Sequence, residues 1–179
     1  MDFQLDTGGT ISGHVLQGDS QPIPDLHVYA TDSSTGTWMA GANTDENGAY
    51  SLVLPSGTYK VMACASCSSL EYVDQWYNNV FEQQNATAVS VTAPTATSDI
   101  DFSLLTGGII TGKVVDNLGQ PIANAYVDAY SSQCWAGPVG GGPTDTNGDY
   151  SFRIPSGSYY VFANGSTQNA NGYVNEWWT

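Results

Sequence analysis

The chain has 179 residues, 41% of them apolar, and 17 acidic against three basic side chains give it a formal net charge of −14. This length and composition fit two globular domains of roughly 90 to 100 residues each and exclude a disordered chain. The negative charge excludes nucleic acid and anionic membrane surfaces as partners, because both repel it. Neither a signal peptide nor a stretch of the ~20 apolar residues that a membrane helix needs stands out, so membrane insertion is not expected.

The sequence repeats itself, with the segment 2–77 aligning almost without gaps to 101–178. Pro55-Ser56-Gly57, for example, returns as Pro155-Ser156-Gly157. The repeated positions are turns and apolar residues, whereas no reactive side chain repeats. A duplicated scaffold without duplicated chemistry favours a structural or binding role, so an enzyme is not expected.

Apolar residues alternate with period two along both repeats, which is the pattern of half-buried strands. In chain order, the first repeat predicts strands over 10–16, 26–31, 38–44, 50–54, 59–63, 72–77, 88–92 and 100–104. The second repeat predicts strands over 109–116, 125–131, 139–144, 150–154, 159–163 and 173–178.

Turn signals separate these strands. Asp45–Gly48 and its repeat Asp145–Gly148 contain Asn-Gly and predict hairpin turns, and each Pro-Ser-Gly predicts a tight reversal. No window of a dozen residues has helical periodicity. Short strands at this density predict an all-β fold of two tandem β-sandwiches with essentially no helix.

A longer string, T-D-x-N-G-x-Y-x-x-x-x-P-S-G-x-Y-x-V-x-A, stands at 44–63 and again at 144–163. It resembles the carboxypeptidase regulatory-like domain, and the resemblance covers most of the chain. The resemblance implies a seven-stranded immunoglobulin-like or transthyretin-like sandwich. It also implies a non-catalytic repeat of secreted and cell-surface proteins.

The two repeats end at different points, which predicts three segments. These are an N-terminal strand at 1–6, a first sandwich at 7–105 and a second sandwich at 106–179 that lacks its closing strands. The segment 85–104 supplies the closing strands of the first repeat, and nothing after Trp178 corresponds to it.

The residues Asp2, Phe3, Gln4 and Leu5 repeat the pattern of Asp101–Leu104. We therefore expect them to form a strand that is donated to the open edge of a neighbouring copy, with Phe3 and Leu5 facing inward. A head-to-tail contact of this kind builds an open filament unless it closes a ring. The alternative is that both ends are cut points in a longer tandem array.

Aromatic residues gather at the same place in both repeats, at Tyr72, Trp76, Tyr77, Tyr173, Trp177 and Trp178. Flat aromatic faces pack against apolar surfaces and also suit sugar rings. This cluster is a candidate for core or inter-domain packing, or for contact with carbohydrate.

The remaining candidates are weaker. Cys64 and Cys67 have C-x-x-C spacing and are a candidate disulfide, with unpaired thiols as the alternative. Asn85 and Asn164 each begin an N-glycosylation sequon, so a glycoprotein is expected if the chain is secreted. The alternating oxygens of Asp145, Asn147 and Asp149 are typical of a calcium loop, but Gly148 is misplaced for that motif and no Glu follows at its twelfth position. A hairpin turn is therefore favoured, and no cofactor or metal is expected.

Together these features predict a non-catalytic repeat subunit of an extracellular or cell-surface fibre, stalk or adhesin. Its expected partners are copies of itself, joined head to tail, and polysaccharide or attached glycans. The competing hypothesis is a carbohydrate-binding or spacer module of a secreted hydrolase.

Overall fold

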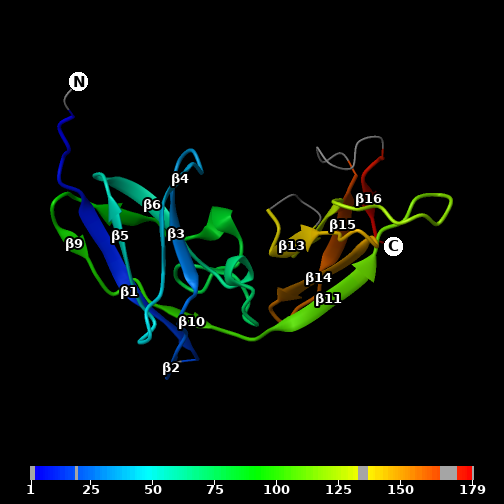
Figure 1. Cartoon of the computed structure of the whole chain (residues 1–179), viewed down its shortest axis with the longest axis horizontal. Coiled ribbons are helices and arrows are strands. Elements are labelled where there is room, and N and C mark those ends of the chain that lie inside the picture. The colour runs from blue at the N-terminus through cyan, green and yellow to red at the C-terminus, as the bar shows by residue number, and fades with distance from the viewer. Residues whose placement is uncertain (1–2, 19, 133–136, 166–172, 179) are drawn as a thin grey trace. The chain divides into compact units, whose positions relative to one another are not determined.

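The structure, a computed structural model, describes residues 3–18, 20–132, 137–165 and 173–178. The chain divides into two compact units, Met1–Leu105 and Thr106–Thr179 (Figure 1). Within the described residues every regular element is a strand, apart from two 3-10 turns, η1 (Ser66–Ser68) and η2 (Gln83–Asn85). The all-β fold predicted from alternation is confirmed.

The first sheet of the first unit is built around the long strand β1 (Gly9–Gln17). Antiparallel to it run β5 (Ala49–Leu54) and the short β2 (Gln21–Pro22). Parallel to it run β9 (Ala96–Thr97) and β10 (Phe102–Leu104). The two parallel strands come from the segment that the sequence assigned to closing strands.

The second sheet of this unit has the order β4-β3-β6-β7, with β8 also paired to β6. Its strands are β3 (His27–Asp32), β4 (Trp38–Asn43), β6 (Gly57–Cys64), β7 (Gln75–Trp76) and β8 (Val89–Val91). The predicted strand over 72–77 is thus only two residues long.

The core of the first unit lies between the two sheets and follows the predicted alternation. Its central side chains are at most 5% exposed and include Tyr50, Leu52 and Leu54 from β5 and Tyr59 and Val61 from β6. Side chains on one face of a strand recur every second residue, so each strand buries one face and exposes the other.

The turns between these strands correct one prediction. Asp45–Gly48 does form a tight turn, in which Gly48 has φ +73° and its N–H donates to the Asp45 carbonyl at 2.9 Å. However, β4 pairs with β3 and β5 pairs with β1, so the turn joins two different sheets and is not a hairpin. The same applies to Asp145–Gly148, because β13 and β14 also belong to different sheets.

The second unit contains six strands among its described residues. They are β11 (Gly108–Lys113), β12 (Tyr126–Tyr130), β13 (Gly140–Pro143), β14 (Asp149–Ile154), β15 (Tyr160–Asn164) and β16 (Glu176–Trp177). β11 pairs with β14 in one sheet, and the other sheet has the order β13-β12-β15-β16. The sandwich of the first unit is therefore repeated, but with fewer strands among the residues described.

Candidate assembly site

The strand β10 closes one edge of the first sheet and shows what that edge accepts. It runs parallel to the end of β1, with Phe102–Leu104 opposite Val15–Gln17. Just before it, the Ile100 N–H donates to the Ser12 carbonyl at 3.1 Å. After it, the Leu104 carbonyl accepts from the Gly18 N–H at 3.3 Å. Backbone bonds at both ends therefore fix the register of the strand.

The two apolar side chains of β10 are buried, Phe102 at 2% exposed and Leu104 at 1%. The Phe102 ring lies 6.2 Å from both Tyr50 and Tyr77, centroid to centroid. The Tyr50 hydroxyl donates to the Ile100 carbonyl at 2.6 Å, and burial raises the pKa of Tyr50 far above its usual value. Burying a Phe and a Leu side chain contributes about 3–6 kcal/mol before ordering costs.

The segment that leads into β7 also contacts β10. The Val73 N–H donates to the Leu105 carbonyl at 2.8 Å, and Gln75 Nε2 donates to the Ser103 carbonyl at 3.4 Å. Val73 is 1% exposed and Gln75 is 2% exposed. β10 thus lies between β1 and this segment and keeps both of them out of water.

Among its described residues the second unit has no strand in the place of β10. β11 ends at Lys113, although the sequence predicted a strand to Asp116. The missing part, Val114–Asp116, corresponds to Val15–Gln17, the residues of β1 that pair with β10. Because a strand is held by its ladder of hydrogen bonds, β11 stops where a neighbouring strand is lacking.

Exposure differs sharply between matching positions of the two units. Val73 is 1% exposed and its counterpart Val174 is 90% exposed. Trp178, the counterpart of the half-buried Tyr77, is 80% exposed. Val115, two residues after the end of β11, is 46% exposed. Apolar side chains that β10 covers in the first unit therefore lie in water in the second.

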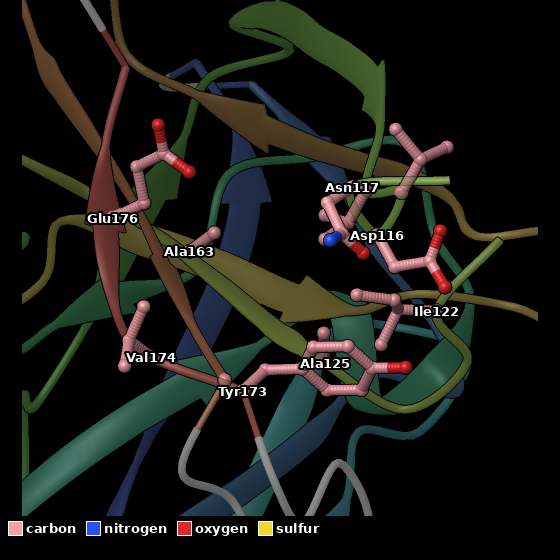
Figure 2. Close-up of a pocket in the computed structure, with 11 residues that line it drawn as sticks. Asp116, Asn117, Ile122, Ala125, Ala163, Tyr173, Val174 and Glu176 are labelled. Atoms are coloured by element: carbon pink, nitrogen blue, oxygen red, sulfur yellow. The ribbon is translucent and has the colours of Figure 1, made fainter. Parts of the chain in front are cut away.

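Val115, Val174 and Trp178 of the second unit line two adjoining hollows of about 340 and 370 Å³. Both hollows are lined by Val114, Val115, Ala163 and Glu176. Together they form what we call the open groove, between the segment 113–117 and β15–β16. Figure 2 shows part of it, with Asp116 and Asn117 on one side and Val174 and Glu176 on the other.

A glycine at the same position of each repeat lies beside the path that the chain takes into β10 in the first unit. A Cβ atom on Gly13 would lie 2.5 Å from the carbonyl carbon of Ile100, so only glycine lets the backbone entering β10 approach β1 this closely. A Cβ atom on Gly112 would instead meet the Tyr150 ring, with Cζ at 2.6 Å. The end of the Tyr150 ring thus occupies the place taken by backbone in the first unit.

Charge is also matched at this position. The His14 N–H donates to Asp101 Oδ1 at 2.7 Å, and His14 Nδ1 lies 3.6 Å from the same oxygen. The counterpart of His14 is Lys113, whose Nζ lies 3.1 Å from Asp149 Oδ1. The open groove therefore has a basic residue, Lys113, at the position whose counterpart, His14, contacts the aspartate that precedes β10 in the first unit.

The predicted donor residues form no strand in the single chain. Residues 3–8 have no regular structure, and Phe3 and Leu5 are 85% and 91% exposed. Gln4 is exposed as well, and Asp2 lies outside the described residues. Two large apolar side chains near the beginning of the chain therefore remain in water.

The aromatic residues predicted in the first unit are packed. Trp76 is 6% exposed and meets the Tyr29 ring edge to face at 6.0 Å. Tyr72 and Tyr77 are partly buried against the core of the unit. Their packing contacts leave little of the Trp76 face for a ligand.

Their counterparts in the second unit are more exposed. Trp177 is half-buried and packs against Phe162 at 4.8 Å and Tyr130 at 5.6 Å. Tyr173 is 43% exposed and Trp178 is 80% exposed, and each lines one of the two hollows. The contrast again follows the absence of a covering strand among the described residues.

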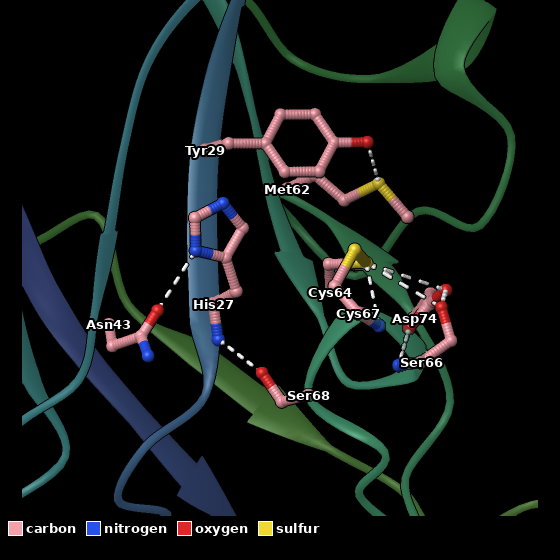
Figure 3. Close-up of a disulfide and its surroundings, with 9 residues drawn as sticks. All are labelled: His27, Tyr29, Asn43, Met62, Cys64, Ser66, Cys67, Ser68 and Asp74. Atoms are coloured by element: carbon pink, nitrogen blue, oxygen red, sulfur yellow. Dashed lines mark hydrogen bonds between the residues drawn. A yellow bond between two sulfur atoms is a disulfide. The ribbon is translucent and has the colours of Figure 1, made fainter.

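The structure joins Cys64 and Cys67 in a disulfide at the end of β6, with a Cα–Cα distance of 5.3 Å (Figure 3). Asp74 anchors the loop, because its carboxylate accepts from the Ser66 backbone N–H at 2.8 Å and from the Ser66 hydroxyl. The second repeat has no counterpart of this cysteine pair, so it stabilises the loop before β7 in the first unit only.

Other sequence candidates show local roles. Asp145 Oδ1 accepts the N–H groups of Asp149 at 2.9 Å and Asn147 at 2.8 Å, and these bonds lower the pKa of Asp145. Within the described ranges, no three His, Cys, Asp or Glu residues are grouped to hold a metal ion. Nor does any helix there have the length and apolar character to cross a membrane.

The two sequons stay predictions. Asn85 is exposed, and its Nδ2 donates to Glu82 Oε2 at 2.7 Å. Asn164 ends β15 and is half-buried, and Ser166 of its sequon lies outside the described residues.

The repeat comparison reveals groove residues that the sequence reading did not select, above all Gly112, Tyr150, Val174 and Glu176. Each is the counterpart of a residue around β10 in the first unit. The signal that could have found them is the alignment of the two repeats, because the neighbours of a closing strand should face the place of a missing one.

Comparison with known proteins identifies the family of the sequence. The carboxypeptidase regulatory-like domain model matches residues 10–105 and again 109–175. No curated protein sequence matches the chain. Among solved structures, the Bacillus anthracis TIE protein is similar at 18% identity and a TM-score of 0.42, over 89% of this chain and 29% of that one.

Two further structures are similar. A streptococcal ancillary pilin matches at 14% identity and a TM-score of 0.39, over 97% of this chain and 58% of that one. The 5-hydroxyisourate hydrolase of Klebsiella pneumoniae matches at 18% identity and a TM-score of 0.35, over 56% of this chain and 99% of that one. Since the family model matches both repeats, the chain belongs to the carboxypeptidase regulatory-like domain family.

Proposed function

We propose that the chain is a non-catalytic structural subunit of an extracellular fibre, stalk or adhesin. Copies join head to tail when the segment 1–6 of one copy adds as a strand to the open groove of the next. The observation that carries this proposal is the agreement between the groove and the segment. Among the residues that the structure describes, the groove has no strand like β10, and the segment Asp-Phe-Gln-Leu repeats the pattern of Asp101–Leu104.

The docked strand follows the register of β10. Phe3 takes the place of Phe102 and Leu5 that of Leu104, so both leave water for the groove. Phe3 then packs against Tyr150 and Trp178, as Phe102 packs against Tyr50 and Tyr77. At about 3–6 kcal/mol for the two side chains, this burial is large enough to drive association once backbone hydrogen bonds add to it.

The charges of the two surfaces support the same register. Asp2 corresponds to Asp101, and Lys113 corresponds to His14. In the docked strand Asp2 can therefore accept from the Lys113 N–H and approach its ammonium group. Such an exposed ion pair contributes less than about 1 kcal/mol, so it selects register more than it adds affinity.

The geometry of assembly follows from where the two surfaces lie. The donor segment belongs to the first unit and the groove to the second, so the contact joins different surfaces of two copies. Contacts of this type propagate into a filament unless the rotation between copies closes a ring. The Cys64–Cys67 disulfide fits an oxidising, extracellular compartment.

The test uses the full chain, by sedimentation velocity and electron microscopy at pH 5 and pH 7. The double variant Phe3→Ser/Leu5→Ser should remove self-association. The matched control Trp38→Ser/Val53→Ser takes two exposed apolar side chains from other strands and should leave it intact. Monomers of the unaltered chain at both pH values, or filaments that persist in the Phe3→Ser/Leu5→Ser variant, would refute the proposal.

A second candidate function is polysaccharide binding, favoured by the 80% exposure of Trp178. Aromatic faces of this kind stack on sugar rings. Affinity electrophoresis on immobilised polysaccharides would show retention that is lost in Trp178→Ala and kept in Phe3→Ser/Leu5→Ser. Docking of the donor strand accounts for the same exposure, because the counterpart Tyr77 packs against Phe102.

A further inference from the structure

One residue of the open groove differs from its counterpart in a way that changes the chemistry of docking. Gln75 lies beside β10, is 2% exposed, and donates from Nε2 to the Ser103 carbonyl at 3.4 Å. The corresponding residue of the second unit is Glu176. The two positions have the same backbone pairing, since Gln75 lies opposite Ala63 and Glu176 opposite Ala163.

The two side chains have nearly the same shape but opposite hydrogen-bonding abilities. A carboxamide donates through its nitrogen, whereas an ionised carboxylate only accepts. In the docked strand the carbonyl of Gln4 takes the place of the Ser103 carbonyl. An ionised Glu176 would therefore face an acceptor without a proton between them, while a protonated Glu176 can donate as Gln75 does.

Burial adds to this conflict. Glu176 is exposed in the single chain, and its carboxylate has no hydrogen bond within the part of the chain that the structure describes. Its counterpart is almost completely buried by β10. Moving an ionised carboxylate out of water without a donor is strongly unfavourable, and the group gains a proton instead.

We propose that docking of the donor strand is coupled to proton uptake by Glu176, so that head-to-tail assembly strengthens in acid and weakens toward neutral pH. The inference rests on the proposed function. It makes Glu176 a regulatory residue of the joint between copies.

The acidic groups around Glu176 favour the same direction, whereas the ammonium group of Lys113 favours the ionised form. The titratable groups that line the two hollows are Lys113, Asp116, Tyr150 and Tyr173, and the arriving strand brings Asp2 and Asp6. Lys113 already donates to the Asn147 carbonyl at 2.8 Å and lies 3.1 Å from Asp149. The acidic neighbours disfavour an ionised Glu176, since like charges at close range raise the cost of ionisation.

The experiment measures self-association of the full chain by sedimentation equilibrium between pH 4 and pH 7.5. Because docking takes up a proton, the association constant should be highest at the acid end of this range and fall by up to about tenfold per pH unit as the pH rises. Glu176→Gln restores the donor of the first unit. This variant should match the unaltered chain near pH 4 and associate at least about tenfold more tightly at pH 7.

The control is Glu46→Gln, which removes one exposed carboxylate from a turn of the first unit and should keep the pH profile of the unaltered chain. As a second readout, calorimetry in two buffers of different ionisation enthalpy should detect proton uptake on assembly near pH 5.5. This uptake should be smaller in Glu176→Gln by up to about one proton.

The outcomes separate the two proposals. Equal pH profiles for Glu176→Gln and the unaltered chain, with equal proton uptake, would overturn the role of Glu176 and leave strand exchange in place. Absence of self-association at every pH in both proteins would overturn strand exchange itself. Both proposals would be supported if Glu176→Gln associates more tightly than the unaltered chain at pH 7 and equally near pH 4.

Discussion

Replacing Gly112 by alanine should separate docking of the strand from folding of the unit that receives it. In the first unit, a Cβ on the matching Gly13 would lie 2.5 Å from the Ile100 carbonyl carbon. Docking would bring the backbone of Met1, the counterpart of Ile100, to the same place beside Gly112. The methyl group that Gly112→Ala introduces should therefore push the donor away from β11, because backbone cannot yield as a side chain can.

The magnitude follows from the bonds that this approach makes possible. The Ile100 N–H donates to the Ser12 carbonyl at 3.1 Å, and the Ile100 carbonyl accepts from the Tyr50 hydroxyl at 2.6 Å. Their counterparts in the joint would be lost, at about 1 kcal/mol each. A loss of about 2 kcal/mol weakens association roughly 30-fold.

Folding of the second unit should change little in Gly112→Ala. The nearest atoms to the new methyl group belong to the end of the Tyr150 ring, which can move aside. The control Gly142→Ala adds a methyl group that meets nothing within 4 Å and should alter neither property. Sedimentation measures association, and hydrogen exchange measures the free energy of unfolding. Unchanged association in Gly112→Ala, with its fold intact, would refute the geometry of docking proposed here.

Three further predictions concern both units. Burial raises the pKa of Asp128 to about 6, so the stabilisation present below about pH 4 should be lost as the pH rises through 6, and Asp128→Asn should abolish this dependence in thermal unfolding. Val174→Ser should change the free energy of unfolding of the second unit by less than about 0.5 kcal/mol but weaken association, whereas Val73→Ser should destabilise the first unit by about 1–3 kcal/mol, as hydrogen exchange can measure. Reducing the Cys64–Cys67 disulfide should lower the free energy of unfolding of the first unit alone by about 2 kcal/mol in the chain-entropy model, and an equal loss in both units would contradict the assignment.

Strand positions could be predicted from the sequence because they depend on neighbouring residues. The alternation of Tyr50, Leu52 and Leu54 predicted the strand β5, which spans Ala49–Leu54. Which strands pair with each other was harder to predict from the sequence. The turn at Asp45–Gly48 was expected to make a hairpin, yet it connects two sheets. Turn chemistry decides that the chain reverses, whereas packing of distant segments decides which strand it meets.

The candidate site divides in the same way. Phe3 and Leu5 could be selected from sequence, because they repeat Phe102 and Leu104 in a pattern that can be read by eye. The surface that would receive them could not, because it is assembled from separate segments. Val174 and Tyr150 belong to different strands or loops, and their exposure appears only when the unit is folded.

The amino-acid sequence by itself determined two copies of one all-β unit and the places where the backbone turns. It also determined that Asp2–Leu5 repeats the pattern of Asp101–Leu104. These properties follow from alternation, from Gly and Pro geometry and from internal repetition, all of which are local. The sequence predicted an open edge in the second unit, but only the tertiary structure showed which residues form the open groove and that Glu176 lies among them. Burial depends on which distant segment covers a residue, and the covering strand β10 exists in the first unit without a counterpart among the described residues of the second.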